Sequence, residues 1–178
     1  MTDPSRDLDR IDRKILAVLQ DNARASNKEL AAHVGLAPSS CLERVKRLIR
    51  DGVIRGFHAE VDPQALGVAL EALVFVRFAQ HQRSLMDALW AHLESLPEVR
   101  DLYDVAGSHD LVVHVAVRDV AHLRSLVADE MASRAELGQL ETSLIFKHQR
   151  TPVVPDYGPD EREPDKSSSR RRSRAKRR

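Results

Sequence analysis

Residues 8–52 read LDRIDRKILAVLQDNARASNKELAAHVGLAPSSCLERVKRLIRDG, and their pattern decides the fold of the N-terminal part of the chain. Across residues 8–21, apolar side chains recur at every third or fourth position, which predicts an amphipathic helix. Ser26 followed by Glu29 has the spacing of a capping box and predicts a second, short helix. Gly35 suits the left-handed turn that ends such a helix.

A third helix is predicted to begin at Pro38, whose fixed dihedral angle suits a first helical turn, and to continue to about Asp51. The residues expected to face inward are Cys41, Val45, Leu48 and Ile49. Two helices joined by a short turn that contains glycine, and braced by a preceding helix, form a helix-turn-helix. This arrangement places its second helix in the major groove of DNA.

The side of the third helix opposite its apolar stripe carries the residues that we expect to contact DNA. They are Ser39, Ser40, Arg44, Lys46, Arg47 and Arg50. A guanidinium group can donate two parallel hydrogen bonds to guanine, and hydroxyl groups can bind phosphates or base edges. A solvated cationic helix face is the alternative interpretation, and the position on the second helix of the motif favours DNA binding.

The second half of the chain predicts strands and helices in the order βαββαβ. The predicted elements are strand 70–79, a helix capped near Ser84 and Asp87, strands 99–106 and 111–117, a helix capped by Asp119, and strand 140–148. This order is typical of a ferredoxin-like fold, in which both helices cover one face of a four-stranded antiparallel sheet. Apolar residues on both faces of strand 111–117 predict that a second subunit covers the open face. We therefore expect an α+β protein that forms a homodimer.

We expect three regions along the chain. Residues 1–62 form a helix-turn-helix (winged-helix-like) domain that ends in a linker strand at 53–62, and residues 63–155 form the ferredoxin-like effector-binding and oligomerisation domain. Residues 156–178 are rich in Pro, Ser and charge and are expected to be a disordered basic tail.

The charges differ between regions although the whole chain has a formal net charge of +1. Residues 1–62 carry 11 Lys and Arg against 10 Asp and Glu, residues 63–165 carry 9 against 17, and the 13 residues from Lys166 carry eight cations and no anion. Only the first and last regions therefore suit a polyanion. The single cysteine, Cys41, excludes an intramolecular disulfide and fits the cytoplasm, and no apolar run is long enough to cross a membrane. The eight histidines show no spacing typical of metal ligands.

Beyond these patterns, the run LDRIDRKILAVLQDNARASNKELAAHVGLAPSSCLERVKRLIRDGVIRGFHAEVDP resembles the N-terminal half of the Lrp/AsnC, or feast/famine, transcription regulators. The resemblance extends over roughly residues 6–150. It implies a regulator of transcription, and not an enzyme, that binds double-stranded DNA. It also implies dimers that assemble further, for example to an octamer, and an amino acid effector that binds between C-terminal modules.

The turn Gly107-Ser108-His109-Asp110 falls where the family has its glycine-to-aspartate turn. Exposed N–H groups of such a turn can hold a carboxylate and an aspartate can hold an ammonium group, the two ends of a free amino acid. The alternative is a plain hairpin in which Asp110 binds backbone amides. The resemblance adds Ser143 and Leu144 to the candidate effector residues.

Two other function classes stay open at this point. A small enzyme would need a catalytic motif, but the chain has no G-x-S-x-G sequence, no phosphate-binding loop and no nucleophile next to a base. A nucleoid-associated architectural protein would bind DNA with little sequence choice, and the basic tail is the feature that favours it. Solubilisation is an equally good explanation of that tail. The identity of the effector and the target genes do not follow from the sequence.

Overall fold

The computed structural model describes residues 8–79, 83–134, 137–151 and 153–157. The chain divides into two compact units. The helical unit contains the described residues up to Ala59 together with those from Arg150 onward, and the sheet unit contains Glu60–Gln149. The proposed domain limits at 62 and 155 stay a prediction. The predicted basic tail, 156–178, lies outside the described residues except for Asp156 and Tyr157.

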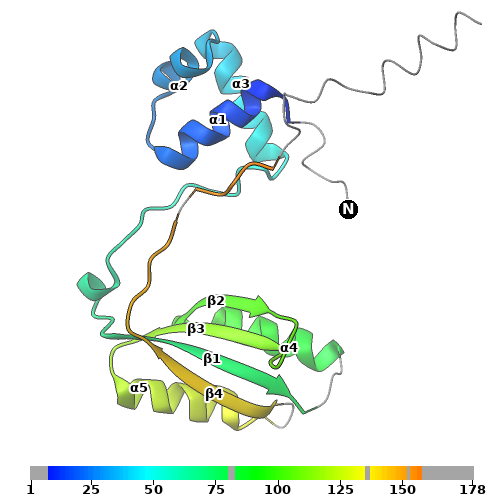
Figure 1. Cartoon of the computed structure of the whole chain (residues 1–178), viewed down its shortest axis with the longest axis vertical. Helices are drawn as coiled ribbons and strands as arrows, with labels where there is room; N and C mark the ends of the chain where they lie inside the picture. Colours follow the sequence, from blue (N-terminus) through cyan, green and yellow to red (C-terminus); the bar gives the residue numbers. More distant parts are fainter. Residues whose placement is uncertain (1–7, 80–82, 135–136, 152, 158–178) are drawn as a thin grey trace, which may run out of the picture. The chain divides into compact units, whose positions relative to one another are not determined.

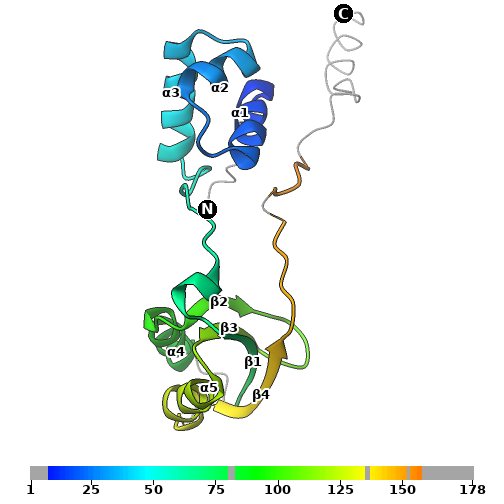
Figure 2. The same ribbon diagram turned by 90° about the vertical axis from the view of Figure 1, so that its left-hand side faces the viewer.

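The helical unit consists of α1 (Arg10–Asp21), α2 (Asn27–Val34) and α3 (Pro38–Arg50), as the sequence predicts. Ser26 and Glu29 form the capping box of α2, with each side chain accepting a hydrogen bond from the other residue's backbone N–H. Gly35 ends α2 with φ +73°, a left-handed conformation that glycine adopts readily. Figure 2 shows the three helices of this unit. The buried residues of their small apolar core are Ile15, Leu30, Ala31, Val34, Cys41 and Leu48.

Two details of the helical unit differ from the sequence prediction. Ile49 is 47% exposed instead of inward, because it lies about 100° around α3 from the buried Leu48. Residues 53–62 form no strand. Instead, the backbone N–H groups of Val53 and Ile54 both donate to the carbonyl of Leu48, which folds these two residues back against the helical core.

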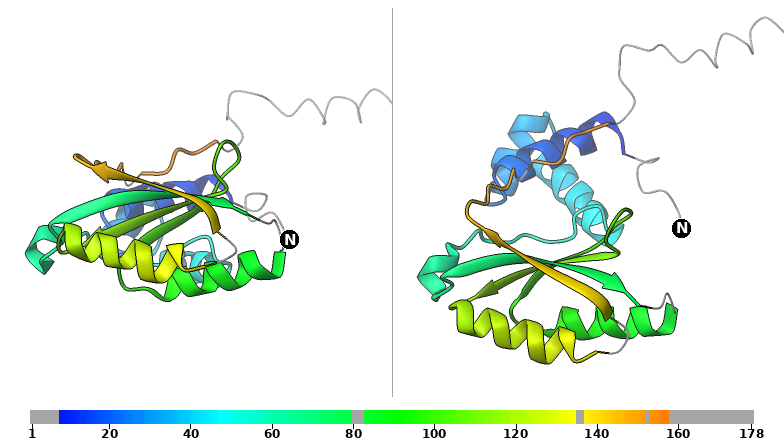
Figure 3. Two further views of the ribbon diagram at one scale, coloured as in Figure 1. Left: turned by 90° about the horizontal axis from the view of Figure 1, so that it is seen from below. Right: turned by 60° about the horizontal axis from the view of Figure 1, so that its bottom comes forward.

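The sheet unit has the predicted βαββαβ order, preceded by a short 3₁₀ turn, η2 (Pro63–Leu66). Its elements are β1 (Leu70–Phe78), α4 (Arg83–Ser95), β2 (Val99–Asp104), β3 (Leu111–Val117), α5 (Val120–Ser125), which continues into a π-helical turn, η3 (Leu126–Ala132), and β4 (Leu137–Ile145). The strands form one antiparallel sheet in the order β2-β3-β1-β4. Both helices cover the same face of this sheet (Figures 1 and 3).

Alternating burial along the central strands separates the two faces of the sheet. On β3, the odd-numbered residues from Leu111 to Val117 are buried against the helices, whereas Val112 and Ala116 on the other face are only partly buried. The core beneath the sheet is apolar: its buried members are Ala72, Val74, Val76, Phe78, Leu89, Leu93, Leu111, Val113, Val115, Val117, Leu123, Leu126 and Met131.

Strand β4 begins and ends earlier than the predicted strand 140–148. Leu137 pairs with Phe78 across an irregularity in β1, and a Cβ on Gly138 would lie only 3.2 Å from the backbone nitrogen of Ala79. Glycine therefore permits the close approach with which the strand begins. Strand β2 also ends at Asp104, before the predicted limit of 106.

Candidate DNA-binding and effector sites

The helix-turn-helix is held together at the turn by a contact between the first residue of α2 and the first residue of α3. The Asn27 side-chain amide donates a 2.8 Å hydrogen bond to the carbonyl oxygen of Pro38. Cys41 and Leu48 bury the inner side of α3, with exposed fractions of 0% and 1%. Burial raises the pKa of the Cys41 thiol, so that thiol stays protonated and unreactive at neutral pH.

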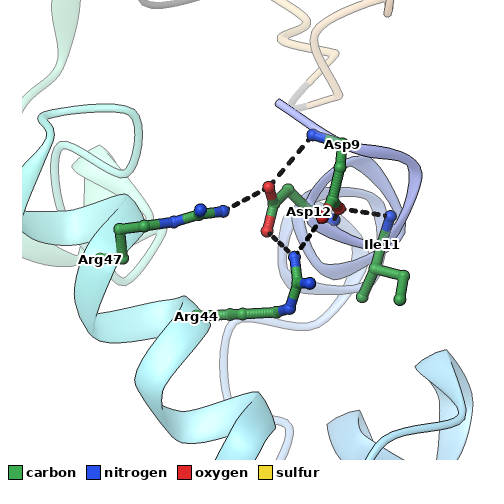
Figure 4. Close-up of polar contacts among 5 residues, drawn as sticks. All are labelled: Asp9, Ile11, Asp12, Arg44 and Arg47. Carbon is green, nitrogen blue, oxygen red and sulfur yellow. Dashed lines mark hydrogen bonds and ion pairs between the residues drawn. The ribbon is translucent and has the colours of Figure 1, made fainter. Parts of the chain in front are cut away.

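The start of α1 carries a carboxylate that is not among the residues predicted from the sequence to form a site. Asp12 is fully buried, and both of its oxygens are bonded (Figure 4). Arg44 donates to its Oδ1 at 2.9 Å, Arg47 donates to its Oδ2 at 2.5 Å, and the backbone N–H of Asp9 donates to Oδ2 at 3.1 Å. A buried carboxylate needs such partners, because an unpaired charge in the interior costs several kcal/mol.

Asp9 adds a second carboxylate to this network. It caps α1 by accepting from the backbone N–H groups of Ile11 and Asp12, and it also accepts a hydrogen bond from Arg44 at 2.5 Å. Burial raises the pKa of the Asp9 carboxyl, but the bonds from Asp12 and Arg44 outweigh this effect and hold the pKa below its ordinary value. The same two aspartates, Asp9 first, raise the pKa of Arg44. The network therefore joins α1 to α3 through ion pairs and hydrogen bonds.

The ion pairs divide the six predicted DNA-binding residues into two groups. Arg44 and Arg47 point toward α1, with side chains 29% and 39% exposed, and do not form the open cationic side expected from their spacing. Their partner lies 32 and 35 residues earlier in the chain, which helix periodicity alone cannot reveal. The exposed members of the predicted set are Ser39, Ser40, Lys46 and Arg50.

The exposed cations of α3 have only weak partners among the described residues. Lys46 pairs with Glu43 at 3.1 Å, and Arg50 lies 3.6 Å from Asp51. Their side chains are 59% and 73% exposed. Exposed pairs of this kind contribute only about 0–1 kcal/mol, so a phosphate can replace either carboxylate at small cost.

The predicted effector turn is a loop between β2 and β3 that is closed by Asp110. The backbone N–H of Val105 donates to the carbonyl oxygen of Asp110, and the Asp110 N–H donates to the carbonyl oxygen of Val76. The Asp110 carboxylate accepts a 2.8 Å hydrogen bond from the backbone N–H of Phe78. Gly107 adopts φ +148°, which favours glycine. Of the two interpretations of this turn, the observed bonds are those of a hairpin in which Asp110 binds a backbone amide.

The other candidate effector residues are spread over two faces. The His109 ring packs against Phe75 with ring centres 5.1 Å apart, and its Nε2 lies 3.8 Å from Glu141; its Nδ1 lies 3.2 Å from the Ser108 hydroxyl. Ser143 pairs with Leu73 on the open face of the sheet, three and five residues along β1 from Val76 and Phe78, the residues that Asp110 contacts. Leu144 pairs with Ala72, whose side chain is buried on the helix side. One chain therefore does not bring all six residues to a single point.

The open face of the sheet carries apolar and charged side chains. The apolar members are Leu73, Phe75, Tyr103, Val112 and Ile145, and Tyr103 is 49% exposed. His114 lies in the middle of this face with Nδ1 3.0 Å from Asp101 and Nε2 3.4 Å from Glu71. Its ring also packs edge to face against that of His148, with ring centres 5.7 Å apart.

A surface depression of about 340 Å³ lies between α4 and β2. It is lined by Trp90, Glu94, Val99, Arg100, Asp101 and Leu102, and contains none of the predicted effector residues. Within the described residues, no group of three His, Cys, Asp or Glu side chains is placed to hold a metal ion. No helix in the described part of the chain is long and apolar enough to span a membrane.

Comparison with known proteins matches both units to described families. Residues 8–55 match the family model "Winged helix-turn-helix DNA-binding", and residues 71–153 match "Lrp/AsnC ligand binding domain". The HTH-type transcriptional regulator AldR of Mycolicibacterium smegmatis is 44% identical over 82% of this chain and 85% of its own length.

Two solved structures of relatives are complexes with an amino acid. A transcriptional regulator of Neisseria meningitidis in complex with L-Met is 30% identical with a TM-score of 0.76, over 83% of this chain and 96% of its own. A feast or famine regulatory protein of M. tuberculosis complexed with L-methionine is 32% identical with a TM-score of 0.73, over 81% and 95% of the two chains.

Proposed function

Because the chain belongs to the Lrp/AsnC family of transcriptional regulators, we propose that it binds operator DNA as a homodimer through α3 and that a free amino acid alters this binding. The observation that carries the DNA-binding part is the division of the cations of α3. Two arginines fix the helix to α1, and the two most exposed cations face outward with weak partners. A helix that contacts base edges needs a fixed position, which the two arginines provide, and free hydrogen-bond donors, which the exposed cations provide.

The DNA contacts follow from this division. Ser39 and Ser40, at the start of α3, donate hydroxyl hydrogen bonds to phosphates or base edges, and Lys46 and Arg50 bind phosphates or guanine. Arg44 and Arg47 act as positioning residues. Each half-site is short, so two helical units on one dimer supply the affinity that a single unit lacks.

The dimer forms by packing the open sheet faces of two copies against each other. This face carries the half-buried Phe75 and the exposed Tyr103, and covering them removes apolar surface from water. Further association to an octamer or a similar assembly gives several pairs of DNA-binding units. Such an assembly works in the cytoplasm with no cofactor other than the effector.

The effector is an amino acid that binds near the loop 107–110. Gly107, Ser108 and His109 offer backbone N–H groups for its carboxylate, while Asp110 holds the loop in shape through Phe78. Ser143 and Leu144 complete the site only when another subunit is present, because they lie on different faces of one sheet. The L-Met in two related structures supports this ligand class. Which amino acid this protein prefers does not follow from them.

The test is fluorescence anisotropy with DNA from upstream of the protein's own gene, compared with random duplex at one salt concentration and repeated with each amino acid. We expect preferential binding to the upstream DNA that shifts with one or a few amino acids. Preferential binding that no amino acid changes would remove the effector site and leave the DNA-binding role.

A second candidate function is an architectural DNA-binding protein with little sequence choice. The eight cations after Asp165 favour it, because such a run binds phosphates without reading bases. This function is supported instead if the protein binds upstream and random DNA with equal affinity and if neutralising the cations abolishes binding to both. The relatives are transcriptional regulators, and we propose that this chain likewise has no enzymatic activity.

A further inference from the structure

The proposed DNA-contacting side of α3 carries an acidic residue at its centre. Glu43 is the one acidic residue in the sequence of this helix, and its side chain is 71% exposed. Ser39 lies four residues before it, and Lys46 and Arg50 lie three and seven residues after it. Residues at these spacings share one side of an α-helix. Three of the proposed DNA contacts therefore surround a carboxylate.

The direction of Glu43 follows from the residues by which α3 packs on the helical unit. At about 100° for each residue, Glu43 lies about 160° around the helix from Cys41 and Val45 and about 140° from Leu48. Cys41 and Leu48 are buried in the core of this unit, and Val45 packs against it. Glu43 therefore points away from the core, on the side by which a recognition helix meets the major groove.

The described contact of the Glu43 carboxylate is weak. The Lys46 ammonium group lies 3.1 Å from its Oε1, and the side chains of Lys46 and Glu43 are 59% and 71% exposed. Exposed pairs contribute little to stability, because water screens their charges. A phosphate that binds Lys46 therefore releases the carboxylate for another hydrogen-bond donor.

A carboxylate on a DNA-contacting surface is unfavourable unless it meets such a donor. The duplex carries about one negative charge for each 1.7 Å of its axis, so its phosphates repel a carboxylate. In the major groove, N7 and O6 of guanine and O4 of thymine are acceptors and repel it as well. The donors there are the amino groups of cytosine and adenine, and adenine has the acceptor N7 beside its amino group. Cytosine is therefore the base that fits best.

We propose that Glu43 is a specificity-determining residue whose carboxylate accepts a hydrogen bond from the N4 amino group of one cytosine in each half-site. This inference rests on DNA binding by α3, as proposed above. Arg44 and Arg47 hold the helix against α1, which fixes the direction of the carboxylate. The same carboxylate disfavours guanine or thymine at that position and weakens binding to DNA that lacks the cytosine. Glu43 thus adds sequence preference and lowers the affinity for DNA in general.

The first measurement separates base recognition from the effect of charge. Anisotropy gives the affinities of the full-length parent, Glu43→Gln, Glu43→Ala and Asp51→Asn for the upstream DNA and for random duplex at one salt concentration. Asp51→Asn is the matched control, because it also removes a carboxylate next to a cation of α3, but just after the end of that helix. The Cys41 thiol, which is buried in the folded unit, verifies by its low reactivity that each variant is folded.

We expect both Glu43 variants to bind random duplex more tightly than the parent, because a negative charge is removed. Their preference for upstream over random DNA should nevertheless fall about tenfold for each half-site, as expected for the loss of one base contact. Asp51→Asn should change both affinities by the same factor and keep the preference of the parent. If the Glu43 variants also keep that preference, the carboxylate acts only through its charge and the inference is overturned.

The second measurement identifies the base. Each pair of the upstream site is changed in turn, C·G to T·A and A·T to G·C, which replaces the amino donor of cytosine or adenine with an oxygen acceptor. We expect the parent to lose about tenfold in affinity at one C·G pair in each half-site, and Glu43→Ala to lose nothing there. Two results overturn the inference: equal losses for both proteins at every position, and a difference between them at A·T pairs alone.

The parent protein by itself tests the proposed function. If it prefers upstream over random DNA and Glu43→Ala shows the same losses at every position, α3 binds its sites without this residue and only the inference fails. If the parent shows no preference for the upstream DNA, the proposed function fails, and the inference fails with it.

Discussion

The interiors of the two units differ in their chemistry. Among the described residues, the sheet unit buries a core of thirteen apolar residues, whereas the helical unit buries six and adds the carboxylate of Asp12 with its two arginines. A small core stabilises a domain only marginally, and a hydrophobic contact does not fix the direction of a helix. Ion pairs with hydrogen bonds have defined geometry. Apolar packing therefore stabilises the sheet unit, while ion pairs set the position of α3 in the helical unit.

The chain contains one probe for each unit. Cys41, the only cysteine, is fully buried in the helical unit, and Trp90, the only tryptophan, packs against the core of the sheet unit. Thiol reactivity with a colorimetric reagent therefore reports opening of the helical unit, and tryptophan fluorescence reports unfolding of the sheet unit. Urea titrations followed by both signals can separate the two stabilities.

The largest effect is expected for Asp12→Ala, which leaves Arg44 and Arg47 without their buried partner. Breaking a buried ion pair from one side costs about 3–5 kcal/mol. In urea, Cys41 should become reactive at much lower concentration, while the fluorescence transition of Trp90 stays in place. A shift of both transitions together would show that the units do not unfold independently.

The reverse result is expected for Leu93→Ala in the sheet unit. Leu93 is fully buried under the sheet, and its truncation leaves a cavity that costs about 3 kcal/mol. The Trp90 transition should move to lower urea and the reactivity of Cys41 should stay unchanged. Leu66→Ala, at a side chain 74% exposed, is the matched control and should move neither signal.

Acid should weaken the helical unit by a smaller amount. The pKa of Asp9 is lowered in the folded state by the bonds from Asp12 and Arg44, which outweigh burial, so folding favours its ionised form. The resulting stability is complete above the unfolded pKa near 4 and is lost as pH falls through the lower folded value. Backbone amide NMR signals of α1 should broaden in this range, and Asp9→Asn should remove the effect. An unchanged acid response in Asp9→Asn would contradict this role.

Local signals in the sequence were sufficient for much of the fold. The capping box of Ser26 and Glu29, the turn at Gly35 and the βαββαβ order follow from neighbouring residues, and the structure confirms them. The early start of β4 depends on its pairing with β1, which is far away in the sequence, and periodicity does not contain such a contact. The absence of a strand at 53–62 goes with the bonds of Val53 and Ile54 to the carbonyl of Leu48, which the residue pattern also does not reveal.

The candidate site was predicted only in part, for the same reason. Spacing placed Arg44 and Arg47 beside Ser40, but their direction depends on Asp12, which lies in another helix. One signal could have revealed it. Asp12 is four residues from both Leu8 and Leu16 and therefore interrupts the apolar stripe of α1 with a charge. A charge in such a stripe needs a partner, and the arginines of α3 were available.

We propose that the cations of α3 are divided between holding the helix and binding DNA. The most direct test measures two properties of Arg50→Gln and Arg47→Gln. One is the salt dependence of DNA binding, and the other is the reactivity of Cys41 in urea. We predict that Arg50→Gln lowers the slope of log K against log salt by about 1 and leaves stability unchanged. Arg47→Gln should cost about 1–3 kcal/mol of stability in the helical unit and keep the parent slope under conditions where that unit is folded. A stable Arg47→Gln protein with a reduced slope, beside an Arg50→Gln protein that binds like the parent, would contradict this division of the cations.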